Sequence, residues 1–442
     1  MGRARLAFGT TGAWPAISAR PMRRIGLDLG TTNSAIAVSE GDGSVRLATH
    51  DHAAGSADTF RSLLYFGAGE KPVGGPRAID RYLDAAGEGR LIQSMKSYLA
   101  DATFQATNIF GRTTSLVDLL TVLLRELRAS AEQKLGPLGS RAVVGRPVHF
   151  VTERDEEDEA LALKRLRQAL ANAGWEDVEL EYEPVAAAHF YESKLDHDEL
   201  VLVADFGGGT SDFSLVRVGP GQKDSGADRI LGSDGVGIAG DALDARLMQK
   251  LVAPKLGQGT TYRSLMGNKE LPVPVWIYAR LLRWHHLSFL KSKKNIEMLE
   301  GMMSQAADGS TLRALLHVLE NDLGYHLYRA IERTKVALSN AEEAVFEFSD
   351  APLEIEAPVT RRAFEEWIDE DMQKMAACVD RLLSRAGVDA KDVDQVFMTG
   401  GSSFVPAVRR IFETRFGASR MRTGGELVSV ASGLALRAMH EA

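Results

Sequence analysis

The sequence predicts an α/β protein with a duplicated domain, and two observations carry this prediction. Short apolar segments of strand length alternate along the chain with segments of helical apolar spacing, which is typical of layered sheets and helices. In addition, RIGLDLGTTNSAIAV (24–38) and LVLVADFGGGTSDFSLV (200–216) share one pattern of strand, aspartate, tight turn and strand. The separation of Asp28 and Asp205 is too long for a solenoid repeat and suits a duplicated domain.

The second of these stretches indicates a ligand that contacts the backbone. A tight turn needs one or two glycines, so three in a row at 207–209, followed by Thr210, predict a close approach by N–H groups turned outward. The flanking Asp205 and Asp212 disfavour a bare anion and fit a phosphate that carries a divalent cation. The alternative is an ordinary glycine-rich hairpin with solvated aspartates. Two such hairpins facing each other would hold a metal–polyphosphate from both sides.

Composition excludes several classes of protein. The 442 residues are 45% hydrophobic and 25% charged, which suits a globular protein of two or more domains. The net charge of −8 argues against bulk nucleic-acid binding and against anionic membranes, so neither is expected as a partner. The single cysteine, Cys378, excludes a disulfide framework, fits a reducing cytoplasm and is expected as a buried apolar residue. No run of eighteen apolar residues is present, so no transmembrane span is expected.

The first residues differ from the rest of the chain. They are rich in arginine, contain no acidic residue and lack the apolar segment of a secretory signal. We expect residues 1–21 to be a disordered leader, or the product of a start codon assigned too early, with Met22 as the true beginning.

Further elements follow in order in the first half of the chain. A strand is expected at 62–66 and a helix at 116–135. RAVVGRPVHF (141–150) is typical of a buried strand that ends in a polar turn. Thr152 is expected to open a helix with an acidic first turn that stops at Gly174, and 178–193 to form a strand leading into a helix.

The second half contains one ambiguous segment. WIYARLLRWHHLSFLKSKKN (276–295) mixes aromatic and basic residues, which would suit a nucleic-acid surface, but its apolar spacing favours one amphipathic helix with a basic face. The adjacent His285 and His286 would point to different sides of that helix, which disfavours a metal site. After it we expect a helix over 325–340, a β-rich stretch, a long helix from Arg361, a strand with a Gly-Gly turn before a helix near Pro406, and a last helix.

Five segments, in this order, resemble the ATPase domain of the heat-shock protein 70 chaperones of the DnaK type. They are IGLDLGTTNS, YEPVAAAHFY, VADFGGGTSDFS, ERTKVALS and TGGSSFVP, and the resemblance covers about residues 24–440. GRPVHF and the divergent middle are most similar to the short, YegD-like branch. The resemblance implies the actin-like ATPase fold, with two lobes of duplicated ribonuclease-H-like cores around a nucleotide cleft. Lobe I would span 22–197, lobe II 198–425, and a C-terminal helix over 426–442 would return to lobe I.

The resemblance also implies a role for individual residues. Asp28, Asp205 and Asp212 would hold Mg²⁺ through its waters, with Asp212 and Thr210 near the γ-phosphate and a monovalent cation such as K⁺. Lys96 and Glu183 would lie by the γ-phosphate and order the attacking water, with Asp205 and Thr210 as further catalytic residues. The remaining positions would bind ATP or ADP: Gly30, Thr31, Thr32, Asn33, Gly207, Gly208, Gly209 and Thr210 at the phosphates, and Glu332, Lys335, Ser339, Gly400, Gly401, Ser402 and Phe404 around the adenosine.

Some of these residues also have a purely structural interpretation. Lys96 would otherwise be an exposed helix lysine, and Glu332 and Lys335 an ordinary i,i+3 ion pair. Asp28 and Asp205 would otherwise be turn residues without a function.

The sequence departs from the family pattern at several places. The family places adenine between two arginines, and Val336 and Phe404 stand at those positions, so cation–π support for the base is missing. Asn33 replaces a tyrosine beside the first hairpin. The given sequence ends at Ala442, so we expect the hydrophobic linker and peptide-binding domain of the chaperones to be missing.

Three functions remain open at this stage. The first is a chaperone-like protein that binds and slowly hydrolyses ATP, with unfolded proteins or co-chaperones on the outer lobe surfaces. The second is an actin-like filament protein, although such proteins usually carry glutamate at the position of Asp212. The third is a small-molecule kinase, for which the sequence shows no substrate-pocket motif with a catalytic aspartate.

Overall fold

The computed structural model describes residues 23–40, 43–52, 55–85, 89–222, 226–264, 269–282, 290–424 and 428–440. The predictions made for residues 1–21, Met22, His285 and His286 lie outside the described residues.

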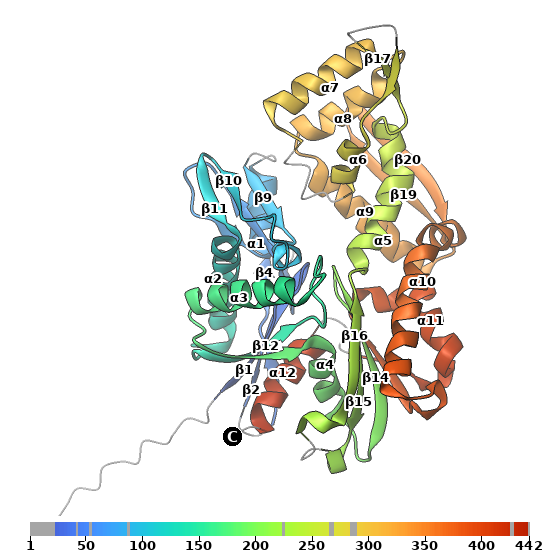
Figure 1. The fold of residues 1–442 in the computed structure, drawn as a ribbon. Helices are drawn as coiled ribbons and strands as arrows, with labels where there is room; N and C mark the ends of the chain where they lie inside the picture. The colour runs from blue at the N-terminus through green and yellow to red at the C-terminus, as the bar shows by residue number, and fades with distance from the viewer. Residues whose placement is uncertain are drawn as a thin grey trace, which may run out of the picture.

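Two central sheets share one strand order, which confirms the predicted duplication (Figure 1). The first sheet has the order β13-β12-β1-β2-β3 and the second β22-β21-β14-β15-β16. Each begins with a three-stranded antiparallel meander; a fourth strand then pairs in parallel with the first, and a fifth pairs in parallel with the fourth. The strands of the first sheet are β1 (Arg24–Asp28), β2 (Asn33–Ser39), β3 (Val45–Leu47), β12 (Arg141–Arg146) and β13 (Asp177–Tyr182). Those of the second are β14 (Glu199–Phe206), β15 (Ser211–Val218), β16 (Ile230–Val236), β21 (Gln395–Thr399) and β22 (Met421–Thr423).

Small strands and four helices complete the first lobe around its sheet. The helix predicted at 116–135 is present with those bounds, because Ser115 caps its first turn together with Asp118 and Gly136 follows its last residue. The remaining elements are β4 (His50–His52), β5 (Gly55–Ala57), β6 (Phe60–Arg61), β7 (Leu63–Phe66), β8 (Val73–Gly74), α1 (Pro76–Asp84), β9 (Arg90–Gln93), β10 (Ala106–Ile109), β11 (Arg112–Ser115), α2 (Leu116–Leu135), α3 (Glu156–Asn172) and α4 (Glu183–Glu192).

The second lobe carries a helical subdomain, α6 to α8, that extends away from its sheet (Figure 1). One large apolar core joins this subdomain to the sheet and includes Cys378, which is fully buried as predicted. The remaining elements are α5 (Gly240–Leu247), β17 (Thr261–Arg263), β18 (Glu270–Pro272), α6 (Val275–Leu281), α7 (Lys293–Gln305), α8 (Ser310–Glu320), α9 (Gly324–Asn340), β19 (Glu343–Asp350), β20 (Leu353–Thr360), α10 (Arg361–Ala386) and α11 (Pro406–Phe416).

The last helix, α12 (Ser429–His440), packs against the first sheet and α4. Two glycines allow this contact. A Cβ on Gly26 of β1 would lie 2.2 Å from the carbonyl oxygen of Ala431, and a Cβ on Gly433 would lie 1.7 Å from that of Ala186. The chain therefore crosses back from the second sheet to the first near its end.

Two predictions about helices are wrong in detail. Thr152 does not open a helix, because it lies in a turn with φ 69° and α3 begins at Glu156, capped by the Asp155 side chain. The segment 276–295 is not one helix, since α6 ends at Leu281 and the Ser292 side chain caps a new helix at Lys293. No helix among the described residues is long and apolar enough to span a membrane.

Candidate functional site: two facing hairpin turns between the lobes

The turns of the β1–β2 and β14–β15 hairpins contact each other. A Cβ on Gly208 would lie 2.2 Å from Thr32 Oγ1, and a Cβ on Gly209 would lie 3.3 Å from Thr31 Oγ1. The threonine side chains of the first turn therefore occupy the space that side chains on the second turn would need. This contact places the two turns face to face, as the sequence pattern predicts, and gives a steric reason for two of the three consecutive glycines.

The other turn glycines, Gly30 and Gly207, make close contacts within their own turns. A Cβ on Gly30 would lie 1.9 Å from the carbonyl oxygen of Asn33, and the Gly207 N–H donates to the Thr210 carbonyl at 2.9 Å. Thr210 itself is 7% exposed, so the second turn is packed rather than solvated.

Three carboxylates meet at the bases of these turns. Asp28 ends β1, while Asp205 near the end of β14 and Asp212 near the start of β15 face each other as paired residues of the hairpin. Burial and the Glu183 charge raise the pKa of both Asp28 and Asp212 to about 7. The same two causes, with the Asp28 charge, raise the pKa of Asp205 well above its usual value. Such a cluster favours a bound cation, which would relieve the repulsion.

Lys96 provides the buried positive charge of this region. Its Nζ donates to Glu183 Oε1 at 2.5 Å, and both side chains are less than 10% exposed. Although burial opposes it, the Glu183 and Asp28 charges hold the pKa of Lys96 above its usual value. The chain reaches Lys96 through Ser94, a non-glycine residue at φ 59°. The alternative of an exposed helix lysine is wrong.

A loop from the first lobe holds Asp212, which the sequence did not reveal. The Val148 N–H donates to Asp212 Oδ1 at 2.8 Å, and Asp212 Oδ2 has no hydrogen-bond partner in the described part of the chain. Buried Arg146 fixes this loop by donating to the carbonyls of Pro147 at 3.0 Å and Val148 at 3.1 Å. A signal was present, namely an arginine directly before a proline at the end of a buried strand in GRPVHF.

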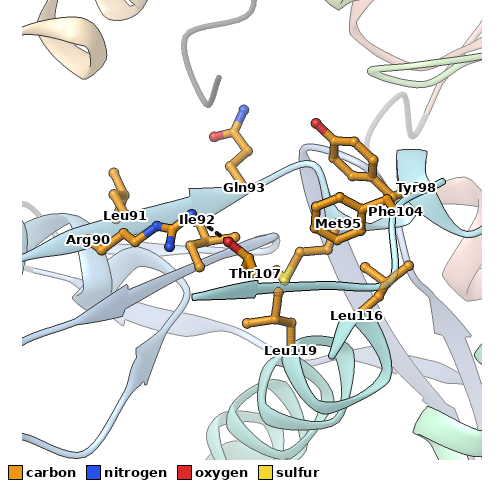
Figure 2. A pocket seen from close by; sticks show the side chains of 10 residues that line it. All are labelled: Arg90, Leu91, Ile92, Gln93, Met95, Tyr98, Phe104, Thr107, Leu116 and Leu119. Carbon is orange, nitrogen blue, oxygen red and sulfur yellow. Dashed lines mark hydrogen bonds between the residues drawn. The ribbon is translucent and has the colours of Figure 1, made fainter. Parts of the chain in front are cut away.

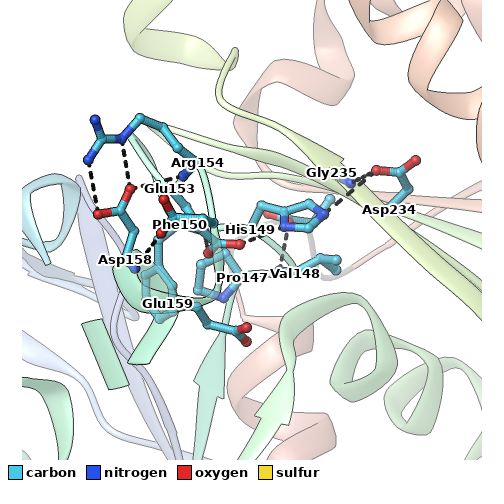
Figure 3. A network of polar contacts seen from close by, with 12 residues as sticks. Pro147, Val148, His149, Phe150, Glu153, Arg154, Asp158, Glu159, Asp234 and Gly235 are labelled. Atoms are coloured by element: carbon cyan, nitrogen blue, oxygen red, sulfur yellow. Dashed lines mark hydrogen bonds and ion pairs between the residues drawn. The ribbon is translucent and has the colours of Figure 1, made fainter. Parts of the chain in front are cut away.

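The Arg146 guanidinium is itself held on several sides. It lies 5.1 Å from the Phe150 ring centroid and 5.0 Å from that of Tyr182, and it pairs with Glu159 at 2.7 Å. His149, which follows Val148 in the same loop, extends toward the second lobe, with 3.8 Å between its Nε2 and Asp234 Oδ1 on β16 (Figure 3). The loop thus contacts two strands of the other lobe.

Gly240, at the start of α5, brings the predicted adenosine residues next to the phosphate turn. A Cβ there would lie 3.3 Å from Ser402 Oγ, 3.6 Å from Lys335 Nζ and 3.7 Å from the Gly207 carbonyl oxygen. Lys335 Nζ also donates to Asp244 Oδ2 at 2.8 Å. Sequence reasoning missed both Gly240 and Asp244, although a glycine directly before a helix was a usable signal.

Glu332 does not pair with Lys335, so the alternative of a simple i,i+3 pair is wrong. Its Oε2 accepts from Arg329 at 2.7 Å, and its Oε1 lies 3.8 Å from Arg61 of the first lobe. Arg61 also donates to Asn33 Oδ1 at 3.2 Å, which links the first turn to α9. The Ser339 hydroxyl donates to the carbonyl of Lys335 in its own helix.

The residues around the Gly-Gly turn differ in exposure. Gly400 has φ 84°, and a Cβ there would lie 2.0 Å from the Phe206 carbonyl oxygen, so only glycine fits. Gly401 is exposed, whereas Ser402 is buried. Val336 and Phe404, which replace the family's arginines, are exposed by 55% and 51%.

The described residues contain no group of three His, Cys, Asp or Glu side chains close enough to ligate one metal directly. The carboxylate cluster fits a different arrangement, in which carboxylates hold a hydrated Mg²⁺ through its waters. The unpartnered Asp212 Oδ2 and the raised carboxyl pKa values agree with this arrangement.

Two sheets of the same strand order, joined at facing hairpin turns, define the actin-like ATPase fold. A sequence model of the family described as "Hsp70 protein" matches residues 90–254 and 319–439. These residues make up more than half of the chain, and the protein belongs to the Hsp70 family.

Proposed function

We propose that the protein binds Mg-ATP between its two hairpin turns and hydrolyses it slowly, as a chaperone-like protein of the short, YegD-like branch. The observation that supports this most is the contact of Thr31 and Thr32 with Gly208 and Gly209. It brings threonine hydroxyl groups and a glycine backbone to one place, which is the chemistry that a polyphosphate requires.

The residues around the turns supply the rest of a phosphoryl-transfer site. A bound Mg²⁺ would neutralise charge that develops on the phosphates, and Asp28, Asp205 and Asp212 would hold its waters. Lys96, which donates to Glu183, would add a fixed positive charge, and Glu183 would orient a water molecule. Positioning and charge neutralisation of this kind carry most of the catalysis in phosphoryl transfer.

The nucleoside would lie over the second lobe. Lys335 and Ser402 flank Gly240 beside the phosphate turn, which favours a nucleotide that runs from the turns toward α9 and the Gly-Gly turn. Glu332 and Ser339 lie on the same helix as Lys335. Client proteins or co-chaperones would bind the outer surfaces of the lobes.

The test is calorimetric titration of the full chain with ATP, with and without Mg²⁺, followed by a single-turnover hydrolysis assay. We expect Mg-dependent binding and slow release of phosphate. Absence of ATP binding in both titrations would contradict the proposal and would mean that this chain has inherited only the fold.

A further inference from the structure

A groove of about 630 Å³ lies on the first lobe, where β10 and β11 form the side of that lobe away from the second lobe (Figure 1). Its walls come from the connection between β7 and β8, from the β10–β11 hairpin and from the first turns of α2. In the described part of the chain, its lining includes none of the residues expected to bind nucleotide or metal. The groove is therefore separate from the cleft between the lobes, and its volume is that of a ligand site.

One edge of the β10–β11 hairpin is held by the lobe. Ile109 and Arg112 flank a two-residue turn and bond each other, so by alternation Asn108 directs its backbone polar groups away from β11. Arg90 of β9 donates to the Asn108 carbonyl and, at 2.8 Å, to the Thr107 hydroxyl, a contact drawn in Figure 2. The outer side of β10 thus has its partners within the lobe.

The other edge of the hairpin is open. Among the described residues, β11 pairs with β10 and with no other strand. Thr113 is the partner of Asn108, so its N–H and C=O point outward from this edge by the same alternation. Three residues of β11, Arg112, Thr113 and Thr114, line the groove. An unpaired strand edge beside a groove offers main-chain hydrogen bonds to an extended peptide.

The turn of this hairpin places an aromatic ring at the groove. Phe110 and Gly111 have φ values of 48° and 82°, as in the two-residue turns that favour asparagine followed by glycine. A bulky residue in this conformation is strained, and Phe110 is also 57% exposed. Neither turn propensity nor burial accounts for a phenylalanine here, whereas contact with a bound apolar side chain does.

The lining beside this ring is apolar. Ile109 is buried, and Phe66, Pro72 and Val122 are half-buried. Side chains of an extended strand alternate between two faces, so such a surface can take every second side chain of a peptide that runs along β11.

The charge that the groove offers to a ligand is positive. Glu70 accepts two hydrogen bonds from Arg81 Nη2, both at 3.0 Å, and Asp118 accepts from the Ser115 hydroxyl at 2.7 Å as part of a helix cap. Arg112 is exposed, and its guanidinium makes no ion pair with a described residue. Within this lining Arg112 is therefore the charged group left for a ligand, and it favours a carboxylate.

We propose that the groove binds an extended segment of a partner protein that carries an acidic side chain with apolar side chains two residues away on either side. The segment would add to β11 through the N–H and C=O of Thr113, its carboxylate would pair with Arg112, and an apolar side chain would pack on Phe110. A second copy of the chain is a poorer occupant, because the edge of a four-residue strand offers far less area than a stable dimer buries. Partners on the outer lobe surfaces are part of the proposed function, but binding here needs no nucleotide.

The test is the fluorescence anisotropy of the peptide Val-Thr-Glu-Thr-Phe, labelled at its N-terminus and amidated at its C-terminus, titrated with the full chain without nucleotide. In antiparallel pairing this peptide can place its first threonine opposite Thr113 and its glutamate opposite Arg112. A counterpart peptide with glutamine in place of glutamate measures the contribution of the charge.

Three variants each remove one contact. Thr113→Pro removes the outward N–H of β11, Arg112→Gln removes the charge, and Phe110→Asn removes the ring but suits the turn. The matched controls, at exposed positions outside the groove lining, are Ala106→Pro at the start of β10, Arg217→Gln and Val345→Asn. Thermal unfolding of each variant checks that it is folded.

We expect the wild-type chain and the controls to bind the glutamate peptide, and to bind the glutamine peptide about three- to fivefold more weakly. Thr113→Pro and Phe110→Asn should each weaken binding of both peptides about five- to tenfold. Arg112→Gln should weaken binding of the glutamate peptide alone. Phe110→Asn should unfold at the same temperature as the wild type or higher, because asparagine tolerates the left-handed conformation, so its loss of binding would not come from a loss of stability.

Failure of the wild-type chain to bind the glutamate peptide would overturn this inference, as would wild-type affinity in folded Thr113→Pro and Arg112→Gln. Sedimentation of the chain as a dimer that Thr113→Pro dissociates, without peptide binding, would also overturn it, because β11 would then pair with a second copy. ATP affinity should be the same in Arg112→Gln and the wild type, so failure of the peptide site and failure of the proposed nucleotide site are recognised separately.

Discussion

The two hairpins at the centre of the molecule share a topology but contribute different chemistry. The β1–β2 hairpin pairs Asp28 with Ala35, whereas the β14–β15 hairpin pairs Asp205 with Asp212. The first turn carries the hydroxyl side chains of Thr31 and Thr32, and the second carries bare glycine backbone. The β1–β2 hairpin thus carries hydroxyl side chains and one carboxylate, and the β14–β15 hairpin carries glycine backbone and two carboxylates.

This difference follows from the contact between the turns. Thr32 Oγ1 occupies the space beside Gly208, so both turns cannot carry side chains at this point. A duplicated fold therefore gains an asymmetric site, because each copy limits what the other can carry. The predictions below test this asymmetry, from the largest expected effect to the smallest.

Loss of one carboxylate should matter most in the second hairpin. In Asp205→Asn we expect the single-turnover rate of ATP hydrolysis to fall at least about 100-fold, because the pair with Asp212 loses half of its charge at a buried position. Asp28→Asn should have a smaller effect, since Asp28 is less buried and has Ala35 as its cross-strand neighbour. Asp369→Asn, at an exposed position of α10, is the control. Wild-type turnover in Asp205→Asn would refute the proposed role of the second hairpin.

A side chain on the second turn should separate the lobes. In Gly208→Ala the new methyl group would meet Thr32, and we expect a loss of roughly 1–3 kcal/mol in the free energy of unfolding and weaker ATP binding. Removing the opposing hydroxyl, in the double variant with Thr32→Ala, should restore part of the stability. Gly139→Ala, with open space around its Cβ, is the control. Denaturant unfolding measures the three variants, and an unchanged Gly208→Ala would show that the turns are not in firm contact.

Among the described residues, a loop of the other lobe holds a carboxylate of the second hairpin only, Asp212. In Arg146→Met the carbonyls of Pro147 and Val148 lose their donor, so the Val148 N–H should hold Asp212 less firmly. We expect the single-turnover rate to fall about five- to tenfold with little change in ATP affinity, as for a positioning residue. The control is Arg154→Met, whose side chain is 75% exposed. Equal losses in rate and affinity would instead indicate general unfolding of the loop.

The smallest effect is expected at the proposed adenine end of the site, whose predicted residues lie in the second lobe. Phe404→Ala should weaken ATP binding about three- to fivefold if the exposed ring stacks on the base. Phe110→Ala, at a similarly exposed phenylalanine of the first lobe, is the control. Calorimetric affinities for ATP and GTP would show whether Phe404 contributes to binding at all. Identical affinities in wild type and Phe404→Ala would exclude a contact with the base.

Sequence predicted the local elements well because their signals are local. The helix Leu116–Leu135 has its cap and its stop within a few residues of its ends, and both hairpins follow from apolar runs around a turn. The start of α3 was misplaced because Thr152 and Asp155 are both plausible caps; in the fold the Asp155 side chain accepts from the Asp158 N–H, and Thr152 lies in a turn with φ 69°. The prediction of a single helix over 276–295 is wrong because the apolar residues keep helical spacing along the whole segment. The Ser292 side chain caps the start of a separate helix.

The sequence by itself determined that two copies of one strand–turn–strand pattern exist, and which residues they carry. Only the tertiary structure decided that Thr32 faces Gly208, that Arg146 holds the loop over Asp212, and that Gly240 joins Lys335 to the phosphate turn. These contacts join residues far apart in the chain, so no periodicity or spacing encodes them. They depend on how two sheets pack against each other, and close packing of side chains and backbone at that boundary fixes which atoms meet.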